Sequence, residues 1–217
     1  MLGATGAVGS RAAAAVARDP DVERLTTIGR RPVEGLEGDF VSQHTADIFD
    51  PSSYRDVLAG HRTAICTLGV GEPSKVDKEQ FVKIDKLAVL DFATECKRAG
   101  VQHFQLLSSV GVDPESRSFF LRCKGELEDG LKALGFERLS LFHPSMILTP
   151  TNRYGVSQAI VLRVWPLLKF ALVGPLRKYR GIAVETLGHA FAANVRTTGA
   201  GVETLEWDEV RALGERG

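Results

Sequence analysis

The sequence has little of what marks a secreted, metal-binding or nucleic-acid-binding protein. Its three cysteines, Cys66, Cys96 and Cys123, lie far apart and form no Cys-x-x-Cys pair, so neither a disulfide framework nor a zinc site is expected. Lysine plus arginine equals aspartate plus glutamate at 27 each, and no run of five basic residues occurs. No net field would therefore attract nucleic acid. We predict no metal ion and no nucleic-acid partner.

A secretory leader and a long apolar run are also missing. Met1 leads directly into a glycine-rich stretch, so no signal peptide is expected. The most membrane-like stretch, Ala159–Leu176, contains Arg163, Lys169 and two prolines, which makes it poor for crossing a bilayer. We expect a buried or lid helix there, with an interfacial helix as the alternative. The cysteine usage and these absences predict a cytoplasmic protein without a transmembrane segment.

A glycine-rich loop opens the sequence. Its three glycines form a Gly-x-x-Gly-x-x-Gly pattern that leads into the helical run Ser10–Ala17. In a dinucleotide-binding loop the first glycine permits a tight turn, the second lets the main chain approach the pyrophosphate, and the third lets the helix pack closely on the sheet. The phosphates then face unpaired N–H groups at the start of the helix. The coenzyme-binding residues expected here are Gly3, Thr5, Gly6, Ala7, Val8 and Gly9.

In a Rossmann fold the glycine loop follows a strand, leads into a helix, and is followed about 20 residues later by a second strand. The surroundings of this loop meet the second and third of these conditions. The loop leads into an alanine-rich helix, Ser10–Arg18, and the apolar stretch Leu25–Ile28 follows at the spacing of the next strand. Only Met1 and Leu2 stand before the loop. A sheet without its first central strand would leave neighbouring strands unpaired. We therefore expect the numbering to begin inside that strand, through truncation or a misassigned start.

Two arginines stand where the choice between NAD and NADP is made. Arg30 and Arg31 follow the strand Leu25–Ile28, at the position where a carboxylate would accept hydrogen bonds from the ribose hydroxyls of NAD. A guanidinium instead offers forked donors and a positive charge to a 2′-phosphate. The sequence therefore favours NADP(H) over NAD(H). The alternative is a solvated pair of arginines at the end of a strand.

Apolar runs alternate with helical patterns along the chain, which is typical of parallel βαβ units. No internal repeat or Gly/Ser-rich linker divides the sequence. We expect one α/β domain over residues 1–217, with a Rossmann-type, doubly wound parallel sheet and a small C-terminal cap, Pro150–Arg180. The expected strands are Leu25–Ile28, Phe40–His44, Thr63–Cys66, His103–Leu107, Arg138–Phe142 and Gly181–Val184. The expected further helices are Pro51–Leu58 with Asp50 as cap, Lys78–Ala99 closed by Gly100, and Ser118–Leu134 closed by Gly135.

In open α/β sheets the ligand lies beyond the carboxyl ends of the strands. The loops at those ends therefore supply further candidates. Asp47 is expected to accept a hydrogen bond from an adenine amino group, with an ordinary loop aspartate as the alternative. Leu68 and Gly69 lie in a glycine-containing loop where backbone can approach the coenzyme, although the glycines can also simply make a turn.

Several ordered motifs together resemble one family. They are the loop Gly3–Gly9, the strand end Ile28–Arg31, and the segments Cys66–Gly69, Gln102–Ser109 and Lys124–Glu128. The chain resembles an atypical short-chain dehydrogenase/reductase, and more narrowly the Tat-interacting-protein-like oxidoreductases. The likeness covers nearly the whole chain and is weakest in residues 151–178. It implies NADPH binding, a Rossmann fold and a Ser-Tyr-x-x-x-Lys active site, with Pro144 as a further coenzyme contact.

The tyrosine of that active site is missing. The resemblance places Lys124 at the lysine position and Ser108 or Ser109 at the serine position, and Phe120 stands four residues before Lys124. A phenyl ring cannot exchange a proton, and general acid–base groups typically contribute about 10²–10⁴ in rate. Lys124 would contact the coenzyme ribose, with an exposed lysine in a charged helix as the alternative. The two serines can instead cap a turn.

His143 is the candidate to replace the phenol. It follows the strand Arg138–Phe142, and an imidazole transfers protons near neutral pH. The alternative is a structural histidine beside Pro144. We therefore predict, as catalytic residues, Ser108, Ser109, Lys124 and His143.

Three functions follow from these observations. The first is an NADP(H)-dependent oxidoreductase that transfers hydride to or from a small carbonyl or alcohol substrate. The second is a non-catalytic NADPH-binding sensor or regulatory protein, which the missing phenol motivates. The third is a sugar-nucleotide epimerase or dehydratase, whose chemistry also usually needs the tyrosine. Association into a homodimer through Lys78–Ala99 and Ser118–Leu134 is expected unless the sheet buries these apolar faces.

Overall fold

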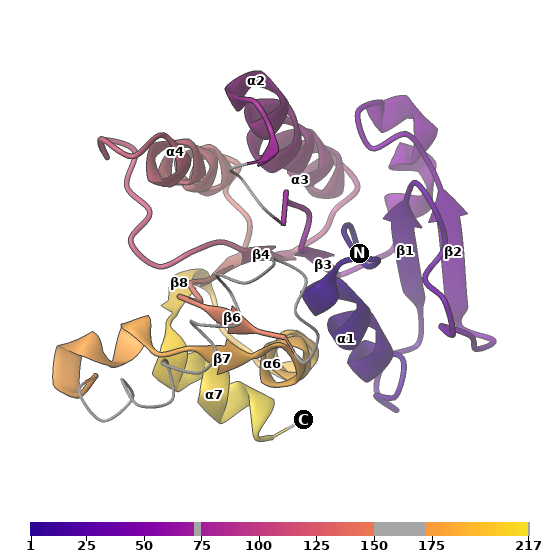
Figure 1. Cartoon of the computed structure of the whole chain (residues 1–217). Helices are drawn as coiled ribbons and strands as arrows, with labels where there is room; N and C mark the ends of the chain where they lie inside the picture. Colours follow the sequence, from indigo (N-terminus) through magenta and orange to yellow (C-terminus); the bar gives the residue numbers. More distant parts are fainter. Residues whose placement is uncertain (72–74, 150–171, 217) are drawn as a thin grey trace.

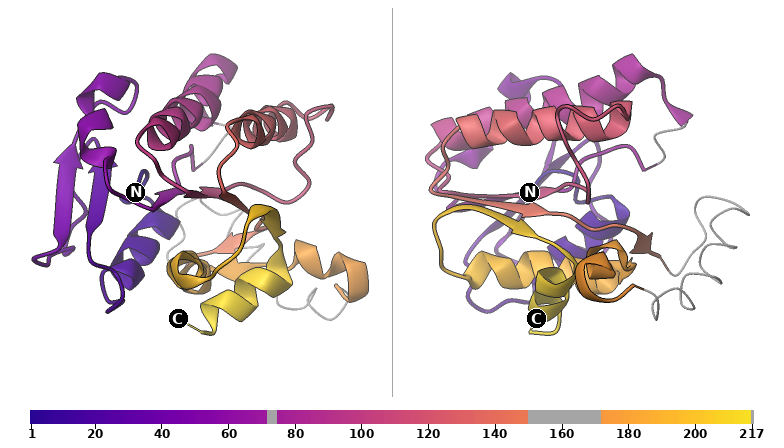
Figure 2. Two further views of the ribbon diagram at one scale, coloured as in Figure 1. Left: turned by 180° about the vertical axis from the view of Figure 1, so that it is seen from behind. Right: turned by 90° about the vertical axis from the view of Figure 1, so that its left-hand side faces the viewer.

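The computed structural model describes residues 1–71, 75–149 and 172–216. A parallel sheet lies between two layers of helices, with α2, α3 and α4 on one face and α1, α6 and α7 on the other (Figures 1 and 2). The strands of the sheet are β1 (Leu25–Gly29), β2 (Val41–Thr45), β3 (Thr63–Cys66), β4 (His103–Leu107), β5 (Arg138–Phe142) and β8 (Gly201–Leu205). The helices are α1 (Ala7–Val16), α2 (Lys78–Val82), α3 (Ala88–Arg98), α4 (Phe119–Ala133), α6 (Val184–Arg196) and α7 (Trp207–Gly214).

All described strand pairs of the sheet are parallel. One set runs in the order β3, β4, β5, β8, and β1 pairs with β2. Leu2 joins the two sets, because it bridges Ile28 of β1 and Cys66 of β3. The resulting order is β2, β1, Leu2, β3, β4, β5, β8, with connections that cross both faces. The predicted α/β class with a doubly wound parallel sheet is confirmed.

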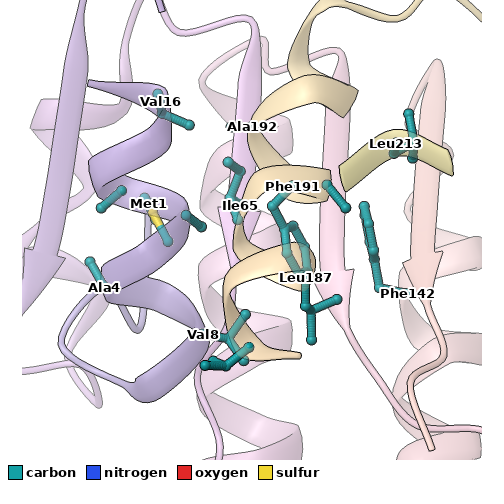
Figure 3. Close-up of a cluster of buried hydrophobic side chains, with 14 of the residues drawn as sticks. Met1, Ala4, Val8, Val16, Ile65, Phe142, Leu187, Phe191, Ala192 and Leu213 are labelled. Carbon is teal, nitrogen blue, oxygen red and sulfur yellow. The ribbon is translucent and has the colours of Figure 1, made fainter. Parts of the chain in front are cut away.

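Each face of the sheet has its own apolar core. On one face Val8 and Val16 of α1 pack with Leu187 and Phe191 of α6 and with Ile65 of β3 (Figure 3). Ala12 and Ala13 of α1 are buried, and Gly188 of α6 lies against Arg11 and Ala12, so the small residues let α1 and α6 approach closely. The other core contains the fully buried aromatic and aliphatic side chains of α3, α4 and β4, among them Phe92, Phe104, Leu127 and Leu131. Burying one such side chain contributes about 1.5–3 kcal/mol.

The structure corrects the expected sixth strand. In place of Gly181–Val184, two residues, β7 (Ile182–Ala183), pair with β6 (Ile147–Leu148) in a separate small sheet. The position beside β5 is taken by β8, which the sequence analysis missed because its pattern is mostly exposed and polar. An edge strand that is solvated on both faces lacks the apolar run used to find strands. Most of the expected cap lies in residues 150–171, outside the described residues; its end contains η5 (Gly174–Tyr179), a 3₁₀-helix.

Two expected helices are irregular. The segment expected as Pro51–Leu58 forms two 3₁₀-helices, η1 (Pro51–Ser53) and η2 (Arg55–Leu58). Tyr54 separates them because its φ of −139° is not helical. The long helix expected over Lys78–Ala99 contains a π-helical turn, η4 (Lys83–Leu87), between α2 and α3. The predicted cap Asp50 accepts a hydrogen bond from the Ser52 amide, and Gly100 and Gly135 have positive φ after α3 and α4.

A buried polar network joins β4, β5, β8 and α6 at the amino-terminal ends of the strands. His103 Nε2 contacts Ser140 Oγ at 2.7 Å, and Ser140 donates to Glu203 Oε1 at 2.5 Å. Arg138 binds both Glu203 at 2.6 Å and Asn194 Oδ1 at 2.7 Å. Burial, with the nearby Arg138 charge as a second cause, lowers the pKa of His103 to about 3. His103 is therefore neutral in the folded protein near neutral pH.

The buried His103 makes the fold sensitive to acid. The folded state holds His103 unprotonated down to a pKa of about 3, whereas the unfolded chain takes up this proton near pH 6.5, the ordinary value for histidine. The stabilising contribution is therefore complete above about pH 6.5 and is lost as the pH falls toward 3, at up to about 1.4 kcal/mol per pH unit. In urea unfolding between about pH 6 and 4, His103→Gln should show a shallower fall in the free energy of unfolding. The control His189→Gln should keep the slope, and equal slopes for both variants would contradict the assignment.

Candidate functional site

The glycine loop follows Leu2, turns sharply against Thr67 and Leu68 after β3, and leads into α1. Gly3 has φ of +86°, and a Cβ there would lie 2.5 Å from the Leu68 amide nitrogen. A Cβ on Gly9 would lie 2.1 Å from the Gly3 carbonyl oxygen. Gly6 is exposed, and it is the N-cap of α1 without any side-chain hydrogen bond to the helix. The loop is therefore closed against β3 by Gly3 and Gly9, while the first amides of α1 remain open to an anionic ligand.

A cavity of about 340 Å³ lies at the carboxyl ends of β1, β2 and β3. Arg30 lines it, whereas Arg31 is exposed and does not. Asp47 does not line the cavity either. Its Oδ1 accepts a hydrogen bond from the Phe49 amide at 3.0 Å, so this side chain stabilises the turn after β2. The remaining described lining residues are Ile48, Phe49, Leu68, Gly69, Val70, Gly71, Lys75, Val76 and Ile84.

Lys124 is buried in an ion pair. Its Nζ lies 2.9 Å from Asp85 Oδ1, and both side chains are at most 6% exposed. Asp85 comes from the π-helical turn η4, and its Oδ2 accepts a hydrogen bond from the Val70 amide at 2.8 Å. The pair therefore connects α4 to the loop that lines the cavity. The alternative of an exposed Lys124 is wrong, because Asp85 faces this lysine from the opposite helix.

A second buried carboxylate lies one turn further along α4. Glu128 Oε1 accepts a hydrogen bond from the Ser108 hydroxyl, and it lies 2.7 Å from His143 Nε2. All three residues are buried. Ser108 follows β4 and His143 follows β5, so the carboxylate joins the ends of two neighbouring strands. The next peptide groups are also joined, because the Val110 amide donates to the Pro144 carbonyl at 3.1 Å.

The structure separates the two serines and shows what surrounds Phe120. The Ser109 hydroxyl is half-buried and contacts only the Val110 carbonyl at 3.4 Å among the described residues. The half-buried Phe120 ring packs against Phe81, with ring centroids 5.5 Å apart. Tyr54 cannot supply a phenol to this site, since it is enclosed in the core against Phe92.

Asp85 and Glu128 are not among the site residues predicted from the sequence. Each lies among charged neighbours on a helix, a pattern that is also typical of an exposed helix face. A signal for both was present, however. Asp85 stands four residues after Phe81, and Glu128 stands four residues after Lys124, so helical spacing places each on the inward face of its helix.

Comparisons with known proteins show the family of this chain. A model of the NAD(P)H-binding family matches residues 3–135. The chain is 30% identical to protein HTATIP2 of Rattus norvegicus over 220 residues, which cover 99% of this chain and 88% of that protein. It is also 32% identical to the mitochondrial protein FMP52 of Debaryomyces hansenii over 148 residues, 68% of this chain and 66% of that protein.

Solved structures share the fold at low identity. MoeE5 in complex with UDP-glucuronic acid and NAD is similar with a TM-score of 0.72 and 16% identity, over 94% of this chain and 74% of that chain. Citrobacter sp. triphenylmethane reductase complexed with NADP(H) has a TM-score of 0.66 and 14% identity, over 95% and 68% of the two chains. Neighbours of both coenzyme types occur, so the fold does not decide between NAD and NADP. No helix of the described residues is long and apolar enough to cross a membrane.

The buried pair makes a testable contribution to stability. Lys124→Met leaves the Asp85 carboxylate buried without its cation, which costs about 3–5 kcal/mol when one partner of such a pair is removed. Lys124→Met/Asp85→Asn removes both charges and should recover a large part of this loss in urea unfolding. Lys132→Met, which disrupts the exposed pair with Asp129, is the control and should change the free energy of unfolding by less than about 1 kcal/mol. Equal losses in the single and double variants would show that the charges are not coupled.

Proposed function

This chain belongs to the NAD(P)H-binding family, and we propose that it transfers hydride between NADP(H) and a small carbonyl or alcohol substrate. The proposal rests on three features that lie together at one edge of the sheet. The open start of α1, the cavity lined by Arg30 and the buried Lys124–Asp85 pair all lie at the carboxyl ends of β1, β3 and β4 or beside the loops that follow them. Ligands of doubly wound sheets bind at this edge.

The residues present fit a phosphorylated dinucleotide. An open helix start without a side-chain cap suits a pyrophosphate, and the largely apolar cavity beyond β2 and β3 suits an adenine ring. Arg30 lines the same cavity, where it offers a guanidinium to a 2′-phosphate. The coenzyme, when bound, supplies or accepts the hydride. Lys124 holds its ribose, and Ser109, the serine hydroxyl that is not tied to Glu128, orients the substrate oxygen.

The second candidate function is an NADPH-binding sensor, and Phe120 favours it. The phenyl ring at the expected tyrosine position packs on Phe81 and has no exchangeable proton to donate. Coenzyme binding without turnover would identify this function. We also propose a cytoplasmic location for this chain. The fungal FMP52 relatives, in contrast, are named mitochondrial. The homodimer and the small carbonyl or alcohol substrate remain predictions.

Removing Arg30 tests the coenzyme preference. Because a charge-assisted contact with a phosphate contributes about 1.5–3 kcal/mol, Arg30→Ala should weaken NADPH binding by about 10–100-fold in calorimetry and change NADH binding little. Arg31→Ala is the matched control, since Arg31 does not line the cavity. An equal loss for both coenzymes in Arg30→Ala would argue against a 2′-phosphate contact, and no heat with either coenzyme in the unchanged protein would refute the function.

Restoring the phenol tests the catalytic assignment. Phe120→Tyr places a hydroxyl one helical turn before Lys124, where the ammonium can lower the pKa of the phenol. We expect NADPH-dependent reduction of 4-nitrobenzaldehyde to rise, by up to the factor of about 10²–10⁴ that a general acid contributes. Phe119→Tyr adds the same hydroxyl to the adjacent ring, which also packs on Phe81, and as the control it should leave the rate unchanged. An unchanged rate in Phe120→Tyr would indicate that this position does not face the substrate.

A further inference from the structure

The Glu128 carboxylate determines what Ser108 and His143 can do. An ionised carboxylate only accepts hydrogen bonds, so the Ser108 hydroxyl and the His143 Nε2–H must both donate to Oε1. A buried carboxylate without such donors would be costly. The contact therefore fixes the His143 tautomer with its proton on Nε2, as carboxylates that orient a catalytic imidazole do.

The other ring nitrogen of His143 is left available. Among the residues that the structure describes, Nε2 is the His143 nitrogen with a hydrogen-bond partner, and Nδ1 has none. The His143 side chain is 10% exposed, and it lies at the end of β5, on the edge where substrate is expected.

We propose that His143 Nδ1 is the proton donor to the substrate oxygen, in place of the missing phenol, and that Glu128 is its positioning residue. The proposal rests on the proposed oxidoreductase function. It assigns Ser108 to the positioning cluster, because its hydroxyl is committed to Glu128.

The proton and electron balance is simple. In the reductive direction the substrate carbon gains a hydride, and the electron pair of the C=O π bond moves onto oxygen. Nδ1 of the Nε2–H tautomer takes up one proton from an acid in solution and passes it to that oxygen, which yields the alcohol and restores the Nε2–H tautomer. The reaction therefore consumes one hydride and one solvent proton. Glu128 keeps its contact with Nε2 throughout.

A nuclear magnetic resonance experiment tests the position of His143 without turnover. Histidine-labelled protein would be observed through its imidazole ¹⁵N signals, with His143→Asn to assign them. We expect the Nε2–H tautomer for His143, and a shift of its Nδ1 signal when NADPH is added. A second cavity lies at the amino-terminal ends of the strands, and His61 and His103 line it. These two histidines serve as internal controls, and their signals should not move.

Glutamine variants of two glutamates on α4 supply the matched comparison. Glu128→Gln replaces the acceptor-only carboxylate by an amide and should abolish the single His143 tautomer. It should also lower kcat for NADPH-dependent reduction of 4-nitrobenzaldehyde by about 10²-fold or more, with the NADPH Kd unchanged. Glu126→Gln disrupts an exposed pair with Lys86 on the same helix and should change neither quantity.

Rescue separates a proton donor from a merely structural histidine. His143→Ala should lose the same factor in kcat, and added free imidazole should restore at least about tenfold of it, whereas Glu128→Gln should not respond to imidazole. His143→Asn keeps a donor for Glu128, so it should fold even if His143→Ala does not, and it should be equally slow.

The outcomes distinguish the two proposals. No NADPH binding by the unchanged protein overturns the oxidoreductase function and the role of His143 together. NADPH binding without aldehyde reduction leaves a coenzyme-binding protein and overturns the proton-donor role. NADPH binding with an unmoved Nδ1 signal, or with full turnover in His143→Asn, overturns the role of His143 alone.

Discussion

The buried ion pair between Lys124 and Asp85 is the constraint that organises the site. Taking two charges out of water is costly unless they are paired and their remaining hydrogen-bonding capacity is satisfied. The second oxygen of Asp85 meets that requirement by accepting from the Val70 amide. One carboxylate therefore holds α4 and the loop after β3 in a fixed relation. That loop forms one wall of the cavity, so the shape of the cavity depends on a charge pair that does not itself line it.

Helix α4 presents three different chemical groups along one face at intervals of four residues. Phe120 packs on Phe81, Lys124 pairs with Asp85, and Glu128 accepts from Ser108 and His143. Each group faces a partner of matching chemistry: the phenyl ring faces another aromatic ring, the ammonium faces an anion, and the carboxylate faces two hydrogen-bond donors. A shift of one residue in the register of the helix would rotate these side chains by about 100°, away from their partners. The polar contacts therefore help to specify the placement of α4.

The fold was largely predictable, and the centre of the site was only partly so. Alternating apolar strands and periodic helices gave the doubly wound sheet, because burial on both faces leaves a strong pattern in β3, β4 and β5. The exposed edge strand β8 leaves no such pattern and was missed. Lys124, Ser108 and His143 could be named as candidates from the sequence, whereas the contacts that Asp85 and Glu128 make with them could not. Helical spacing places Asp85 and Glu128 on inward faces, but it does not say which side chain of another element faces each of them.

Two buried histidines on neighbouring strands show how position decides chemistry. His103, at the amino-terminal end of β4, contacts a hydroxyl beside Arg138, and burial with that charge lowers its pKa to about 3. Such an imidazole cannot act as a proton donor near neutral pH. His143, at the carboxyl end of β5, instead faces the carboxylate of Glu128, and its side chain is 10% exposed. Residue type alone does not distinguish these two side chains. The sign of the neighbouring charge and the end of the strand at which each histidine lies do distinguish them.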